Sequence, residues 1–221
     1  MTDIILKHKG TVDKFIGDAI MAFWNAPVEQ KDHAILACGC ALEQIKTLEK
    51  LRDEIMNLGF PEISIGCGLN TGVAVIGNMG SNNRFDYTAM GDTINLGSRL
   101  EGLTKQYGVS IIVSESTYEK AKQTQDFTFR KLDIVAVKGK NIPVTIYELC
   151  TSFQDKFNSL YETALELYLK RKFKKALSKF EEALLIKRED MSCSLFIERC
   201  KEFIKHPPEK DWNGAWVMKT K

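Results

Sequence analysis

The sequence has no long hydrophobic run, few prolines and no paired cysteine motif. No stretch of its 221 residues approaches the roughly 18 consecutive apolar residues that a membrane-spanning helix needs. The apolar stretch near the start, Ile4 to Leu6, is too short for a secretory signal. The net charge of +2 favours neither a nucleic acid nor an anionic membrane as a partner. These absences predict a cytoplasmic protein, or in a longer chain a domain at the cytoplasmic face of a membrane.

The six cysteines form no Cys-x-x-Cys pair, and the three histidines are not spaced with them as metal ligands. Cys38 and Cys40 lie two residues apart within a predicted helix, so their side chains face different ways. We therefore expect neither a zinc site nor a disulfide, but reduced thiols in the interior.

Hydrophobic periodicity divides residues 1–150 into helices and strands. We expect helices over residues 2–9, 35–58, 93–107 and 115–122. We expect a hairpin of two strands over 11–24, two strands around a Thr71-Gly72 turn over 63–76, one strand over 109–113, and two strands joined at 139–141 over 127–149. A polar loop is expected over 77–83. Hairpins mixed with strand–helix alternation indicate an α+β fold with helices on one face of a sheet.

The composition changes after Leu149. Residues 157–187 are almost wholly helix formers, and their apolar spacing predicts two helices joined near residues 170–174. This pair is similar to one tetratricopeptide-type hairpin; because stacked repeats need about three units, it must pack on the rest of the chain, a partner or another copy. The segment His206–Trp216 cannot continue a helix, and we expect its two tryptophans to pin the chain end down.

Two Gly-Asp pairs carry the strongest functional signal. Gly17-Asp18 lies between two alternating apolar runs, the pattern of a tight β-hairpin that raises one carboxylate clear of a sheet. Gly91-Asp92 precedes a helical pattern that Asp92 can cap, in which Asn95 and Arg99 are four residues apart and share a face. One exposed acid with an Asn and an Arg one turn apart is suited to binding a metal and a phosphate.

The segments Val12–Trp24 and Asp86–Glu101 together closely resemble the class III nucleotidyl cyclases, the adenylate and guanylate cyclases. The resemblance implies a ferredoxin-like cyclase core over residues 1–150, followed by a small α-helical hairpin in a tail over 151–221. It implies an adenylate cyclase that converts ATP into 3′,5′-cyclic AMP and pyrophosphate. A helical tail with a Pro-Pro, Trp-rich end also follows the cyclase domain in some bacterial sensor cyclases.

The resemblance assigns catalytic and metal-binding roles to three residues. Asp18 matches one of the two metal-binding aspartates of the family, and its hard oxygen ligands suit Mg²⁺ or Mn²⁺, two ions of which fill a complete site. Asn95 and Arg99 match the catalytic pair. Asn95 would orient the ribose, and Arg99 would stabilise the charge that grows on the phosphoryl oxygens.

Three further residues match substrate-binding positions. Lys14 and Thr88 match the pair that reads the purine; a Lys donor to adenine N1 and a hydroxyl acceptor for the 6-amino group favour ATP. Guanylate cyclases usually carry Glu and Cys at these positions. Lys138 matches the lysine that binds the terminal phosphates, with Lys140 as the alternative.

The chain departs from the family at its start. The family's domain begins with a strand that carries the first metal aspartate and with a turn that cradles the triphosphate, and no segment here matches them. Asp3 precedes Asp18 by only 15 residues, too few for that role. We therefore expect this chain to be weak or inactive alone. Because the family works as head-to-tail dimers, its partner would be a second copy or a complete cyclase subunit.

Other functions stay open at this point. The chain could be a catalytically incomplete regulatory or dimerisation module, or a guanylate cyclase. It could also act through its tail, by binding a protein partner with residues 151–221. A diguanylate cyclase is not favoured, because the sequence has no Gly-Gly-Asp/Glu-Glu-Phe turn.

Overall fold

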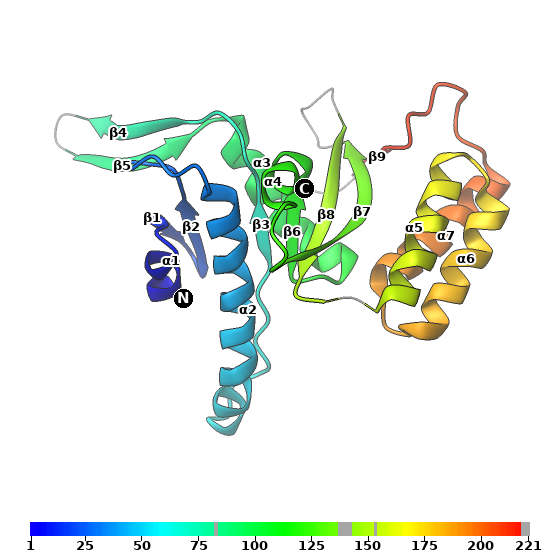
Figure 1. Cartoon of the computed structure of the whole chain (residues 1–221), viewed down its shortest axis with the longest axis horizontal. Coiled ribbons are helices and arrows are strands. Elements are labelled where there is room, and N and C mark those ends of the chain that lie inside the picture. The colour runs from blue at the N-terminus through cyan, green and yellow to red at the C-terminus, as the bar shows by residue number, and fades with distance from the viewer. Residues whose placement is uncertain (82–83, 137–142, 153, 218–221) are drawn as a thin grey trace.

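The computed structural model describes residues 1–81, 84–136, 143–152 and 154–217 (Figure 1). Lys138, Lys140 and the predicted junction at residues 139–141 lie outside the described residues. A five-stranded sheet in the order β3-β6-β8-β7-β9 forms the centre. Its strands are β3 (Cys67–Leu69), β6 (Ile111–Ser114), β7 (Thr128–Ala136), β8 (Val144–Cys150) and β9 (Trp216–Val217).

Helices cover both faces of this sheet, so the prediction of helices on one face was wrong. These helices are α3 (Asp92–Tyr107) on one face and α2 (His33–Asn57) and α4 (Glu115–Ala121) on the other, whereas α1 (Thr2–Lys7) lies beside α2. Successive residues of β6 point to opposite faces: Ile111 and Val113 pack with α2 and α4, and Ile112 packs with α3. A strand buried on both faces reads as one apolar run, which cannot reveal which face a helix covers.

Two antiparallel hairpins form separate sheets beside the centre (Figure 1). The first, β1 (Thr11–Ile16) and β2 (Ala19–Phe23), confirms the hairpin predicted over residues 11–24. The second, β4 (Val75–Ser81) and β5 (Arg84–Met90), shows that the polar loop predicted over 77–83 was wrong. Gly and Asn in this segment suggest a loop, but a two-stranded ribbon needs only backbone pairing and tolerates polar, solvated side chains.

Of the two strands predicted over residues 63–76, the first is reduced to Cys67–Leu69, and the second begins only at Val75, as the start of β4. Gly68 explains how α3 reaches β3. A Cβ atom at Gly68 would lie 2.2 Å from the backbone nitrogen of Glu101 and 2.3 Å from the carbonyl oxygen of Gly97. The helix backbone that carries the predicted catalytic residues therefore rests directly on the strand backbone.

The described part of the tail contains three helices rather than the predicted two: α5 (Asp155–Leu169), α6 (Phe173–Ile186) and α7 (Met191–Lys205). Their shared core is aromatic, and Trp212 packs against Tyr168, Phe173 and Phe203. Trp216 pairs with Val135 of β7, so both tryptophans hold the chain end as predicted. The likeness to a tetratricopeptide hairpin stays a prediction.

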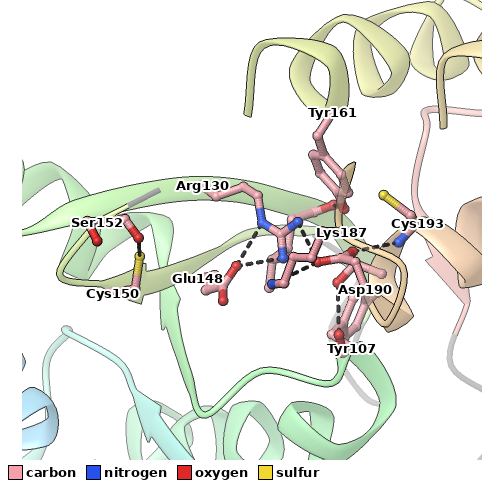
Figure 2. A network of polar contacts seen from close by, with 11 residues as sticks. Tyr107, Arg130, Glu148, Cys150, Ser152, Tyr161, Lys187, Asp190 and Cys193 are labelled. Atoms are coloured by element: carbon pink, nitrogen blue, oxygen red, sulfur yellow. Dashed lines mark hydrogen bonds and ion pairs between the residues drawn. The ribbon is translucent and has the colours of Figure 1, made fainter. Parts of the chain in front are cut away.

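Buried ion pairs attach the tail to the sheet. Arg130 of β7 is fully buried; its Nε donates to Glu148 of β8 at 2.7 Å and its Nη1 to Asp190 at 3.0 Å (Figure 2). Asp190 also accepts from the backbone amide of Cys193 at 2.9 Å and so caps α7. The guanidinium thus links two strands to the start of the last helix.

A second buried cluster lies further along β7. Asp133 accepts from Arg199 of α7 at 2.5 Å and from the hydroxyl of Tyr107 at the end of α3 at 2.6 Å. The hydroxyl of Ser192 donates to the Tyr107 carbonyl at 2.9 Å. These contacts confirm that the helical tail packs against the rest of the chain.

All six cysteines are free thiols; four are buried, and Cys67 and Cys150 are partly exposed. Burial raises the pKa of Cys38 to about 12, so this thiol stays protonated and unreactive. Among the residues that the structure describes, no helix is long and apolar enough to cross a membrane.

Two glycine substitutions test the contact between α3 and β3. We expect Gly68→Ala to cost about 1–3 kcal/mol or more, because the new methyl group meets backbone atoms that cannot rotate away. Gly102→Ala, on the open side of the same helix, should instead stabilise by about 0.5–1 kcal/mol. Urea unfolding measures both values, and equal effects would contradict the close approach.

Asp190 makes the attachment of the tail sensitive to acid. Burial pushes the pKa of Asp190 upward, but Arg130, the Cys193 amide and Lys187 outweigh burial, and the pKa lies below its ordinary value of 3.8. A depressed carboxyl pKa stabilises the fold above the unfolded value and loses this effect as the pH falls through the folded value.

We expect Asp190→Asn, which retains the cap, to cost about 1.5–3 kcal/mol at neutral pH by removing a charged partner of Arg130. The difference from the unsubstituted chain should shrink below pH 3.8, where Asp190 itself becomes protonated. Chemical unfolding over this pH range checks the prediction, and a difference that does not change with pH would contradict it.

Candidate active site

The tip of the β1–β2 hairpin presents Asp18 to solvent. Gly17 adopts a φ of 62°, which the turn requires and which glycine tolerates without a steric penalty. The strands pair from Thr11 with Phe23 to Ile16 with Ala19, so Gly17 and Asp18 form the two-residue turn. Asp18 is exposed, as the sequence predicts.

Lys14 and Thr88, 74 residues apart in sequence, meet through a third residue, Asp13. The hydroxyl of Thr88 donates to Asp13 Oδ2 at 2.7 Å, and the backbone amide of Ala89 donates to the same oxygen at 3.1 Å. Lys14 Nζ lies 3.3 Å from Asp13 Oδ1. The structure therefore brings the two predicted purine-reading residues together at the contact between β1 and β5.

A β-bulge turns Asp13 toward β5. Val12 pairs with Ala22 and Lys14 pairs with Met21, which leaves Asp13 as the extra residue of β1. Its side chain is 0% exposed, whereas that of Lys14 is 43% exposed. Sequence analysis missed Asp13; the available signal was an acid inside an alternating strand, where Asp is disfavoured.

Asn95 and Arg99 lie in the first two turns of α3, and both side chains are exposed. The predicted cap at Asp92 was wrong, because Gly91, with a φ of 135°, occupies the N-cap position. Asp92 is the first helical residue, where its negative charge complements the positive end of the helix dipole. Gly91 links β5 directly to α3, so Thr88 and Asn95 sit on consecutive elements.

A cavity of about 320 Å³ lies beside the start of α3, lined by polar groups that include Asn70, Thr93 and Ser116. The amide of Asn70 donates to the Thr93 carbonyl at 2.9 Å, and the Ser116 hydroxyl donates to the Thr71 carbonyl at 2.6 Å. None of the predicted site residues that the structure describes lines this cavity.

Within the described ranges, the structure gathers no group of three or more His, Cys, Asp and Glu side chains that could hold a metal ion. Asp18 supplies one exposed carboxylate, and Mg²⁺ bound through one or two carboxylates takes its remaining ligands from water and substrate phosphates. The described residues therefore do not make up a two-ion site by themselves.

Comparisons with known proteins show the family to which this chain is similar. The model of the adenylate and guanylate cyclase catalytic domain matches residues 1–151. Adenylate cyclase 1 of Rhizobium meliloti is 40% identical over 148 residues, which are 67% of this chain and 22% of that protein. The terminal-differentiation-specific adenylate cyclase of Dictyostelium discoideum is 35% identical over 204 residues, 89% of this chain and 10% of that protein.

Solved structures give the same result. The adenylyl cyclase CyaB from P. aeruginosa has a TM-score of 0.62 at 35% identity, with 70% of this chain and 78% of that chain covered. The guanylyl cyclase Cya2 has a TM-score of 0.60 at 32% identity, with coverage of 70% and 76%. The chain spans about a fifth and about a tenth of the length of the two curated relatives above.

Proposed function

The chain belongs to the family of adenylate and guanylate cyclase catalytic domains, and we propose that it acts in the conversion of ATP into cyclic AMP and pyrophosphate. The contact between Lys14, Asp13 and Thr88 carries this proposal. A cationic donor and a hydroxyl oxygen that share Asp13 suit a purine, which presents N1 and a 6-substituent next to each other. Relatives of 35–40% identity that are adenylate cyclases support the same choice.

Adenine and guanine differ in polarity at these two positions. Adenine N1 accepts a hydrogen bond and its 6-amino group donates, whereas guanine N1 donates and its 6-oxygen accepts. Lys14 has only donors to offer, so it suits adenine N1 and leaves guanine N1 unpaired. This mismatch is the physical ground for preferring ATP over the guanylate cyclase alternative.

We assign the remaining steps of nucleotide handling to α3 and to the β7–β8 connection. Asn95 orients the ribose, and Arg99 stabilises negative charge on the phosphoryl oxygens, since a guanidinium keeps its proton and matches phosphate geometry. Lys138, outside the described residues, binds the terminal phosphates. Asp18 contributes one carboxylate toward Mg²⁺ or Mn²⁺.

Exposed apolar side chains on both hairpins support a dimer with a second copy or with a complete cyclase subunit. Phe15 and Ile16 on β1 are 64% and 58% exposed, and Val75 and Phe85 on the second hairpin are 67% and 64% exposed. Such a concentration on two neighbouring ribbons is typical of a surface that another chain covers. In the family arrangement one subunit supplies the metal-binding residues and the other supplies the purine-reading and catalytic pairs.

We propose a division of the chain into a catalytic part, residues 1–150, and a helical part, residues 151–221. The helical part offers a second candidate function, binding of another protein. Its basic excess favours an acidic partner surface, with 15 Lys and Arg against 11 Asp and Glu. The match to the Dictyostelium discoideum cyclase over 204 residues indicates that this relative continues past residue 150 as well.

Base choice is testable at the two purine-reading positions. Lys14→Glu with Thr88→Cys should shift the preference from ATP toward GTP, because Glu accepts from guanine N1. Each lost polar match costs about 1–3 kcal/mol, or roughly tenfold to a hundredfold in relative kcat/KM. Competition between ATP and GTP in the completed domain measures the ratio, and an unchanged ratio would remove both residues from the purine site.

The division of labour within the dimer is testable by complementation. Residues 1–221 alone, with ATP and Mn²⁺, should make little or no cyclic AMP. The partner in this test is a copy with an added upstream strand and helix that carry the missing aspartate, and with the substitution Arg99→Ala. When the two are mixed, the unsubstituted chain should restore turnover by supplying its own Arg99.

Two matched variants of the chain of residues 1–221 complete this experiment. Arg99→Ala should reduce the restored turnover about a hundredfold to a thousandfold, because the partner has no arginine to replace it. Asp18→Ala should leave turnover unchanged, since the metal-binding residues of that site come from the partner. Loss of activity with Asp18→Ala would contradict the head-to-tail arrangement.

A further inference from the structure

Asp13 is a buried carboxylate between the two residues proposed to read the purine. Both of its oxygens face groups of the proposed site: Oδ2 accepts from the Thr88 hydroxyl and the Ala89 amide, and Oδ1 faces Lys14 Nζ at 3.3 Å. The bulge in β1 is what brings this side chain to β5. An acid at this place requires an explanation, because burial of a carboxylate is costly unless it is paired.

The hydrogen-bond polarity of Thr88 follows from this contact. A threonine hydroxyl has one proton and two lone pairs, so on its own it can donate or accept. An ionised carboxylate has no proton to give and can only accept. The 2.7 Å contact therefore uses the Thr88 proton, and the oxygen of Thr88 can only accept from any further partner.

We propose that Asp13 is a specificity-determining positioning residue, which selects adenine by holding the Thr88 hydroxyl as an acceptor for an exocyclic amino group. The proposal rests on the proposed function of Lys14 and Thr88 in purine recognition. Without Asp13, the Thr88 hydroxyl is free to rotate and to donate to the 6-oxygen of guanine. Asp13 would then discriminate between the bases without touching either.

The same carboxylate also acts on Lys14. Asp13 Oδ1 forms an ion pair with the Lys14 ammonium at 3.3 Å, and this attraction holds the positive charge beside Thr88. The Lys14 side chain is 43% exposed, so its ammonium can donate to a ligand. One buried acid thus fixes the Thr88 hydroxyl as an acceptor and holds the Lys14 donor beside it, a pair that matches adenine.

A merely structural role for Asp13 predicts something different. In that case the carboxylate only ties β1 to β5 by satisfying the Ala89 amide, and its loss lowers the stability of the hairpins. Affinity for ATP and for GTP would then fall by the same factor. The ratio of the two affinities therefore separates the two roles.

The experiment measures displacement of a fluorescent ATP analogue from the full chain of residues 1–221 by ATP and by GTP. We expect Asp13→Asn to lower the ATP:GTP affinity ratio about tenfold or more, because the amide can donate to Thr88 and release its proton. Asp86→Asn, which removes the charge of an exposed residue on β5, is the matched control and should leave the ratio unchanged.

A double-mutant cycle tests whether Asp13 acts through Thr88. Thr88→Val removes the hydroxyl and should itself lower the ratio, and Asp13→Asn should then change the ratio less than twofold further. Thr88→Ser retains a hydroxyl and should keep the preference for ATP. If Asp13→Asn does not fold, Asp13→Ser replaces it, since its hydroxyl can accept from the Ala89 amide and donate to Thr88.

The outcomes separate this inference from the proposed function. If the unsubstituted chain prefers ATP and Asp13→Asn leaves the ratio unchanged, the inference fails and purine reading by Lys14 and Thr88 stands. An equal effect of Asp13→Asn with and without the Thr88 hydroxyl also overturns the inference alone. If the unsubstituted chain binds neither nucleotide, or both equally, the proposed recognition site fails and the inference falls with it.

Discussion

The contacts of two buried arginines, Arg130 of β7 and Arg199 of α7, hold the parts of this molecule together. Arg130 and Asp133 lie on one strand, and the register shift between Lys131 and Asp133 puts Asp133 on the same side as Arg130, toward the helical tail. Each meets an opposite charge on or beside α7, Asp190 for the first and Arg199 for the second. A buried charge that loses its partner costs several kcal/mol, so the tail and the sheet are stable in this arrangement only together.

Local pattern was sufficient to predict most elements but not how they are assembled. Gly17-Asp18 and the apolar spacing of residues 93–107 define a hairpin and a helix, because turn chemistry and helical period act within a few residues. The β4–β5 ribbon was missed because its Gly and Asn residues favour loops when read locally. The placement of helices on both faces depends on β6, whose buried run carries no periodicity to read.

The candidate site shows the same division between local and long-range information. Resemblance to the cyclase family picked out Lys14, Thr88, Asn95 and Arg99 from short motifs. Lys14 and Thr88 are joined by Asp13, which contacts Thr88 across 75 residues of sequence and does so because of a one-residue bulge. A bulge shifts every later side chain to the other face, and no local rule predicts its position from sequence.

Bulges that redirect an aspartate occur twice in this chain, and the two cases differ in what the buried acid meets. Asp133 meets a guanidinium and a phenol within the core, where the contacts hold elements in place. Asp13 meets a hydroxyl and an ammonium at the edge of the molecule, where both partners still have capacity to bind something else. In the second arrangement Lys14 is 43% exposed, so a charged donor stays accessible beside the Thr88 hydroxyl, as the proposed reading of a base requires.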